Sequence, residues 1–269
     1  MTSFDFASLE ARAEAAIALA RRVGRDVAAF RAEALPQTLA VENKGVQDFV
    51  TVADKRAEEA IRTALMQTFP QDAFMGEESG GQVGRGGTWV VDPIDGTTNF
   101  IRGFRHWGVS IAFVAAGEIQ IGVIYDAAQD KVFHAIRGNG AFKDGQPISA
   151  SHVTDPSRAI AILGHSRRTK FEDYLAVTST LYECGVDYRR MGAAAIGLAR
   201  VAEGVSDVYF ERHLSPWDML AGILIAREAG ARIATAPLAE MIGGGGPVVA
   251  CAPGLVQALS FLFDAAGCR

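Results

Sequence analysis

The chain has 269 residues, of which 49% are hydrophobic, and its formal net charge is −5. This length exceeds the roughly 100–200 residues of a typical domain, so one large domain or two closely packed halves are expected. An acidic chain with no apolar run of about 18–20 residues is expected neither to span a membrane nor to bind nucleic acid directly.

The cysteines and the N-terminus indicate the compartment. Cys184, Cys251 and Cys268 are widely spaced and form no CxxC pair, which favours reduced thiols over a disulfide framework. Acidic and basic residues interrupt the first segment, so no secretory apolar stretch is present there. We therefore predict a cytoplasmic protein.

The first 70 residues favour helices. Apolar residues at helical spacing predict a long amphipathic helix over residues 5–34, which Pro36 ends. A second helix is expected over Asp54–Phe69, with Asp54 in its first turn. The polar segment Glu42–Val52 between them predicts an exposed loop.

The middle of the chain changes to short β-branched and aromatic runs separated by turn residues, which predict antiparallel strands. These strands are expected at Trp89–Val91, His106–Ala115, Ile119–Tyr125 and Lys131–Ile136. A hairpin turn is expected at Lys143–Gln146.

After Ser149 strands and helices alternate, which is typical of an α/β arrangement. The expected strands are Ala159–Leu163, Val186–Arg189, Asp207–Phe210 and Pro247–Cys251. The expected helices are 169–184, Ala193–Ala202 and Pro216–Ala229, with one more at the C-terminus. The sequence thus predicts an α+β half over residues 1–150 and an α/β half over residues 151–269, joined as one compact unit.

The segment Trp89–Phe100 carries the most chemical information. An apolar strand delivers Asp92, Pro93 is expected to stop the strand, and Asp95 follows on a short bend. Gly96 and Thr97 come next and would expose backbone N–H groups if a helix or tight turn begins there, which makes a ready anion site.

Two carboxylates about 4 Å apart repel each other by roughly 4 kcal/mol at an effective dielectric constant of 20. A cation relieves that repulsion, and hard oxygen ligands beside a phosphate cradle favour Mg²⁺. The alternative is a polar turn in which Asp92 and Asp95 only cap local N–H groups. Read alone, the Asp-x-x-Asp-Gly pattern leaves both interpretations open.

Two further acidic motifs favour the metal site. Gly76-Glu77-Glu78-Ser79 follows the short apolar run Ala73–Met75, and Asp218 opens a helix after Ser215 and Pro216. Either acid taken alone is ordinary, because glutamates are common in solvated loops and an acid in a first helical turn is usually a capping group.

Together these motifs resemble the signatures of the inositol monophosphatase family. That family has Gly-Glu-Glu-Ser, then Asp-Pro-Ile-Asp-Gly-Thr-Thr-Asn-Phe, then Trp-Asp before a helix of small residues. All three occur here in that order between Gly76 and Gly222. The resemblance extends over nearly the whole chain and implies a layered αβαβα sandwich of the inositol monophosphatase/fructose-1,6-bisphosphatase type.

The resemblance also implies the metal ligands. It assigns two or three Mg²⁺ ions per site to the carboxylates of Glu77, Asp92, Asp95 and Asp218 and to the backbone carbonyl of Ile94. Within that set, Glu77 and Asp92 hold the metal that activates water.

Catalytic and substrate-binding residues follow from the same resemblance. Thr97, oriented by Asp54, matches the group that positions the attacking water, and Glu77 serves it through the metal. The substrate contacts implied are Asp95, Gly96, Thr97, Gly192, Ala194, Glu211 and Asp218. The segment from Lys44 to Asp54 is one residue shorter than in animal members, so no role in a mobile flap is carried over to Lys44.

These residues imply a phosphoric monoester hydrolase, most consistent with myo-inositol-1-phosphate or a similar polyol phosphate as substrate. Histidinol-phosphate phosphatases share every acid named above and are the alternative. A bisphosphate nucleotidase is less favoured, because the sequence shows no extra basic cluster for a second phosphate. A non-catalytic partner role in transcription or ribosome assembly is a further alternative, since bacterial relatives act on RNA polymerase complexes. The expected partners are a small phosphorylated alcohol and a second copy of the chain, as a homodimer.

Overall fold

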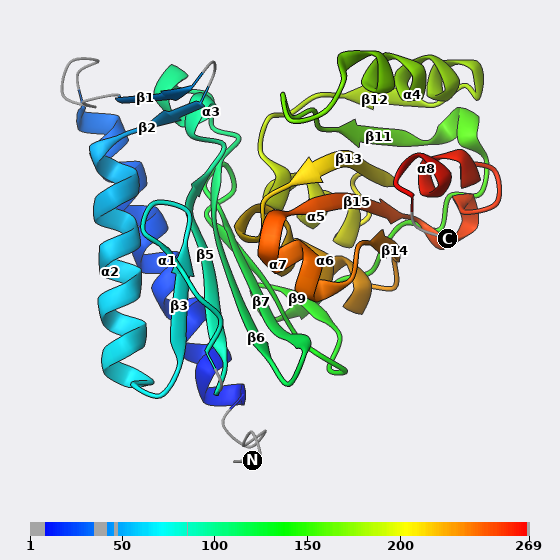
Figure 1. Ribbon diagram of the computed structural model, residues 1–269. Coiled ribbons are helices and arrows are strands. Elements are labelled where there is room, and N and C mark those ends of the chain that lie inside the picture. The colour runs from blue at the N-terminus through cyan, green and yellow to red at the C-terminus, as the bar shows by residue number, and fades with distance from the viewer. Residues whose placement is uncertain (1–8, 35–41, 46–47, 85, 268–269) are drawn as a thin grey trace.

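The structure of the protein is a computed structural model that describes residues 9–34, 42–45, 48–84 and 86–267. Its elements stack as alternating layers (Figure 1). Helices α1 (Leu9–Glu33) and α2 (Val52–Thr68) form the first layer and cover an eight-stranded sheet. Helices α5 (Ala194–Ala202) and α6 (Pro216–Glu228) separate this sheet from a five-stranded one, whose outer face carries α4 (Phe171–Glu183) and α8 (Ser260–Ala265). The predicted α+β fold, an αβαβα sandwich, is confirmed.

The first sheet has the strand order β10-β9-β8-β7-β6-β5-β3-β4. Its strands are β3 (Ala73–Gly76), β4 (Gly80–Gly81), β5 (Thr88–Asp95), β6 (Gly108–Ala115), β7 (Glu118–Asp126), β8 (Lys131–Ile136), β9 (Ala141–Lys143) and β10 (Gln146–Pro147). The run from β5 to β10 is antiparallel throughout, which confirms the predicted meander. Among the described strands of this sheet, β3 and β5 are the one parallel pair, so the carboxyl ends of these two strands lie at the same edge of the sheet.

The second sheet has the order β12-β11-β13-β15-β14. Its strands are β11 (Ile160–Leu163), β12 (Asp187–Arg189), β13 (Val208–Leu214), β14 (Arg232–Thr235) and β15 (Gly246–Cys251). β11 pairs in parallel with both β12 and β13, whereas β15 is antiparallel to its neighbours. The sequence predicted four of these strands and missed β14, together with α7 (Leu238–Gly244).

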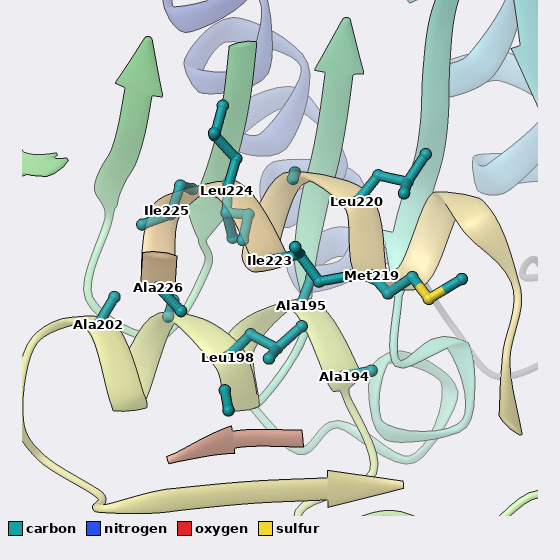
Figure 2. Packing of buried hydrophobic residues seen from close by; sticks show 14 of the residues in the cluster. Ala194, Ala195, Leu198, Ala202, Met219, Leu220, Ile223, Leu224, Ile225 and Ala226 are labelled. Atoms are coloured by element: carbon teal, nitrogen blue, oxygen red, sulfur yellow. The ribbon is translucent and has the colours of Figure 1, made fainter. Parts of the chain in front are cut away.

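Three apolar clusters fill the spaces between the layers. One lies between the two sheets, and each of the other two lies on the outer face of one sheet. Figure 2 shows the middle one, where α5 and α6 pack against each other. Helix α6 lies buried between the two sheets, and a Cβ on Gly222 would lie 2.6 Å from Leu198. Each leucine or isoleucine side chain that is fully buried in this cluster contributes about 1.5–3 kcal/mol to the stability of the fold. The first turn of α6 is therefore held rigidly, and that turn carries Asp218.

Two local predictions were wrong. The segment Glu42–Val52 contains strands β1 (Glu42–Gly45) and β2 (Asp48–Val50), which pair antiparallel, where a loop was expected. Lys44 lies in β1, and its side chain is outside what the structure describes. In addition, Pro93 does not end its strand. The register shifts between Asp92 and Asp95, so Pro93 lies in a bulge where its missing N–H costs no ladder hydrogen bond.

Within the described residues, no helix combines the length and the apolar character needed to cross a membrane. The predicted division of the chain near residue 150 stays a prediction. The first sheet uses residues 73–147 and the second uses residues 160–251, while α6 packs against both.

Candidate metal centre

Three carboxylates from distant parts of the chain converge between the sheets. The bulge of β5 presents Asp92 and Asp95, and the first turn of α6 presents Asp218. One oxygen from each of these carboxylates lies within 4.8 Å of the others. Asp92 and Asp95 are buried, and Asp218 is half-buried. Three carboxylate oxygens at this spacing form a donor set suited to a hard divalent cation.

Asp218 also caps the helix that carries it. Its Oδ2 accepts a hydrogen bond of 3.0 Å from the backbone N–H of Ser215, which completes a capping box at the start of α6. The capping role and the metal-site role, which the sequence left as alternatives, are therefore compatible in one side chain.

Asp95 joins the two halves of the molecule. Its Oδ1 accepts the N–H of Ala194 at 2.9 Å, and its Oδ2 accepts the N–H of Ile196 at 3.3 Å. Both donors lie in the first turn of α5, whose dipole favours an anion at that end. The structure thus brings the predicted substrate contact Ala194 against a predicted metal ligand, and its N–H is already used by Asp95.

The electrostatics of the cluster follow from burial and from mutual repulsion. Burial raises the pKa of Asp95 to about 7, and the charge of Asp218 adds to that increase. The pKa of Asp92 is raised well above its ordinary value, first by burial and then by the charges of Glu77, Asp218 and Asp95. Without a cation, these groups hold protons that free carboxylates release.

Glu77 lies beside Asp92, as its effect on the pKa of Asp92 indicates. Its backbone N–H donates to Val91 O at 3.1 Å at the end of β3. The turn that follows is held by Glu58, a residue that the sequence analysis did not select. Glu58 accepts the N–H groups of Glu78 and Ser79 at 2.7 and 2.8 Å from inside α2. In the sequence, the signal for Glu58 was its position one helical turn after Asp54, which places both acids on the same face of the helix.

The glycine turn after Asp95 opens helix α3 (Thr97–Arg102), as the anion-site interpretation requires. Gly96 has a φ of 91°, and a Cβ there would lie 3.0 Å from the Cβ of Ala193. Only glycine combines this left-handed backbone with such a close approach.

The Thr97 hydroxyl lies between two acceptors. It is 3.2 Å from Asp54 Oδ1 and 3.1 Å from Ile94 O. Asp54 is itself buried, and its Oδ2 accepts the N–H and the hydroxyl of Thr51 at 2.8 and 2.5 Å. The orientation of Asp54 is therefore fixed by the capping box of α2, and through it the position of the Thr97 oxygen is fixed as well.

Glu211 lies on β13, buried near the acids. Burial raises its pKa to about 8; Asp218 and Asp95 also raise it, while a hydrogen bond from Tyr209 opposes the shift. The Tyr209 hydroxyl lies 2.7 Å from Glu211 Oε2, and a Cβ on Gly164 would come within 1.8 Å of the same oxygen. Neither residue was selected from the sequence. Tyr209 lies two residues before Glu211 on the same strand, so strand periodicity could have indicated it, whereas the contact of Gly164 depends on the pairing of β11 with β13.

Gly192 stands across from the glycine turn. It has a φ of 77°, and its carbonyl oxygen would lie 3.2 Å from a Cβ on Gly96. The Asn99 side chain holds the segment around Gly192 next to the glycine turn, because its Nδ2 donates to His106 O at 2.7 Å and to Met191 O at 2.8 Å. The predicted site residues from both halves are therefore neighbours in space.

These pKa shifts predict how metal-free stability depends on pH. Between about pH 4 and 7 the folded chain holds a proton on Asp95 that the unfolded chain releases, and the raised pKa of Asp92 acts in the same direction. The contribution of these groups to the free energy of unfolding therefore falls as pH rises through that window. Mg²⁺ removes this penalty, so it should raise the melting temperature more at pH 7.5 than at pH 5. Thermal denaturation with EDTA and with Mg²⁺ at both pH values measures this, and an equal Mg²⁺ effect at both would contradict it.

Comparison with known proteins places this site in a family. The profile described as "Inositol monophosphatase family" matches residues 8–259. The chain is 36% identical over 253 residues to "Nus factor SuhB" of Salmonella typhimurium, which covers 91% of this chain and 92% of that protein. It is 39% identical over 218 residues to "Inositol-1-monophosphatase" of Rhizobium meliloti, covering 80% of each. The crystal structure of extragenic suppressor protein suhB from Bartonella henselae superposes with a TM-score of 0.87 at 32% identity, over 94% of this chain and 98% of that one.

Proposed function

Because this chain belongs to the inositol monophosphatase family, we propose that it hydrolyses a small phosphate monoester in a Mg²⁺-dependent reaction. The preferred substrate on this proposal is myo-inositol-1-phosphate or a similar polyol phosphate. The observation that carries it is the cluster of Asp92, Asp95 and Asp218, in which one oxygen of each carboxylate lies within 4.8 Å of the others, with the glycine turn that opens α3 directly after Asp95.

The donor set fits Mg²⁺. Every candidate ligand is a hard oxygen, and burial together with the repulsion between the carboxylates raises the pKa values of Asp92 and Asp95, an effect that a divalent cation would offset. The residues that would hold the metals are Glu77, Asp92, Asp95 and Asp218, with the carbonyl of Ile94. When bound, Mg²⁺ supplies positive charge to the phosphoryl oxygens and lowers the pKa of coordinated water.

The protein's own residues supply orientation. The N–H groups of Gly96 and Thr97, at the start of α3, would hold the phosphate oxygens. The Thr97 hydroxyl donates to Asp54, which fixes its position. Its oxygen would accept a hydrogen bond from the attacking water and so align that water. Glu211 and Gly192 would contact the alcohol, and Ala194 would do so through its methyl group because its N–H is bound to Asp95.

A substrate panel with metal replacement tests this function. We expect hydrolysis of inositol-1-phosphate that needs Mg²⁺, stops on chelation, and falls at high Ca²⁺, because the looser coordination of Ca²⁺ suits a near-octahedral site poorly. Histidinol phosphate and adenosine 3′,5′-bisphosphate in the same panel distinguish the alternatives. Phosphatase activity that survives exhaustive chelation would exclude the metal-assisted mechanism.

A second candidate function rests on the relatives named "Nus factor SuhB". A role in transcription complexes would not require the carboxylate cluster, so a metal-site variant separates the two. A pull-down in which the Asp92→Asn protein still enriches transcription factors would support this role. Cytoplasmic location, a homodimeric state and the absence of direct nucleic-acid binding stay predictions.

A further inference from the structure

Helix α2 contacts the candidate metal centre at two points along one face. Asp54, in its first turn, holds the Thr97 hydroxyl. Glu58 lies one turn further along the same face and is only 3% exposed. A glutamate is almost never buried to this extent unless its carboxylate has specific partners. The partners of Glu58 therefore indicate what its burial serves.

Those partners are two successive backbone N–H groups. Oε2 of Glu58 accepts the N–H of Glu78 at 2.7 Å, and Oε1 accepts the N–H of Ser79 at 2.8 Å. Hydrogen bonds to an ionised carboxylate are roughly twice as strong as those between neutral groups. Both oxygens of Glu58 are thus used by the turn that follows β3.

This turn begins with Glu77. Gly76 is the partner of Val91 in the parallel ladder of β3 and β5, so the next residue on β3 comes beside Asp92. The N–H of Glu77 donates to Val91 O at 3.1 Å. The sheet therefore holds the backbone at Glu77 itself, and Glu58 holds the two residues that follow.

The approach of Glu58 to this turn requires a glycine at position 76. A Cβ on Gly76 would overlap the Glu58 carboxylate and displace it from its two donors. Gly76 does not have a positive φ, so its lack of a side chain is needed for this contact and not for the backbone conformation. The helix cannot easily move away, because its buried apolar face packs against the first sheet.

From these contacts we infer that Glu58 is a positioning residue for Glu77. By holding the N–H groups of Glu78 and Ser79, it fixes the direction in which the Glu77 side chain leaves the backbone, and so it raises the affinity of the carboxylate cluster for Mg²⁺. Residues that orient a metal ligand without touching the metal typically contribute about 10–100-fold to metal affinity or activity. The inference rests on the proposed function, because it takes Glu77 as a metal ligand.

The two acids of α2 then have separable roles. Asp54 acts on the Thr97 hydroxyl, whereas Glu58 acts on a metal ligand. Excess Mg²⁺ should compensate for the loss of Glu58, since a weaker site can still be filled. It should not compensate for the loss of Asp54. At saturating Mg²⁺ the kcat of Glu58→Gln should therefore return toward the wild-type value, while that of Asp54→Asn should stay low.

Mg²⁺ titration calorimetry on the full chain, without substrate, tests the inference independently of turnover. Glutamine has the size of glutamate but one acceptor oxygen, so in Glu58→Gln the amide NH₂ would face one of the two N–H donors. The Mg²⁺ dissociation constant should rise by about tenfold.

Asp72→Asn is the matched control. Asp72 is a second buried acid, directly before β3, and it accepts hydrogen bonds from Arg12 and from Trp89 Nε1. Its replacement should lower the melting temperature in EDTA and leave the Mg²⁺ dissociation constant unchanged.

Gly76→Ala disturbs the same contact from the side of the turn and keeps the carboxylate of Glu58. It should weaken Mg²⁺ binding as Glu58→Gln does, and it remains a test if Glu58→Gln does not fold. Gly84→Ala is its control, because a Cβ there would crowd Ala73 at the other end of β3. This control should bind Mg²⁺ with wild-type affinity.

The outcomes separate this inference from the proposed function. Weaker Mg²⁺ binding that is confined to the Glu58 and Gly76 variants would support the positioning role, even if no phosphate monoester were hydrolysed and the proposed function failed. Wild-type affinity in either folded variant would overturn it, and in a protein that hydrolyses phosphate monoesters would leave the proposed function standing. Equal weakening in Asp72→Asn, or a loss of kcat in Glu58→Gln that saturating Mg²⁺ does not repair, would likewise overturn it.

Discussion

Asp92→Asn is expected to reduce Mg²⁺-dependent hydrolysis by about 10³-fold or more, because a metal contributes several kcal/mol of charge stabilisation in such reactions. The same change should stabilise the metal-free protein. Asp92 is buried among Glu77, Asp95 and Asp218, and its pKa is raised well above its ordinary value. Asparagine carries no charge and needs no proton to remain buried.

The gain should appear near neutral pH as a higher free energy of unfolding and a higher melting temperature of the metal-free protein. Asparagine can still accept the 2.9 Å hydrogen bond from the Ile94 N–H, so the local turn is kept. Steady-state kinetics and thermal denaturation in EDTA measure the two effects. A metal-free Asp92→Asn protein that melts well below the wild type would show that Asp92 has a structural role.

Asp95→Asn is the matched comparison. It should lose activity to a similar extent, but its metal-free form should gain less stability. Both oxygens of Asp95 accept N–H groups of α5, from Ala194 and Ile196. An asparagine has one acceptor oxygen, so its amide would face one of these donors. Equal stabilisation by both variants would mean that the contact with α5 contributes little.

The second large effect is expected for Arg200→Met. Arg200 lies in the last turn of α5 and pairs with Asp126 on β7 and with Glu203. The Arg200 side chain is 10% exposed and that of Asp126 is 0% exposed, so removing the arginine leaves a buried carboxylate without its cation. Such a loss typically costs about 3–5 kcal/mol.

Urea denaturation measures this cost, and Arg25→Met is the control. Arg25 pairs with Asp130 at 2.8 Å on the surface, where the two side chains are 54% and 51% exposed. An exposed pair contributes about 0–1 kcal/mol. If both variants lowered the free energy of unfolding by a similar amount, the buried pair would have no special importance for the packing of α5 against the first sheet.

Much of the site could be predicted from the sequence, because it depends on local patterns. The motifs around Glu77, Asp92 and Asp218 each lie where a strand ends or a helix begins, and such boundaries follow from apolar periodicity and capping residues. The antiparallel strands between Trp89 and Ile136 were predicted for the same reason. Where local signals were weak, as in the polar segment Glu42–Val52, the prediction was wrong.

The amino-acid sequence by itself therefore determined the fold class, most of the secondary structure and the acidic residues of the site. The tertiary structure decided which distant groups meet. The pairing of β11 with β13 places Gly164 against Glu211, although the two residues are far apart in the sequence. The physical reason is that helix and strand periodicity act over a few residues, whereas the partners of a side chain depend on how whole layers pack.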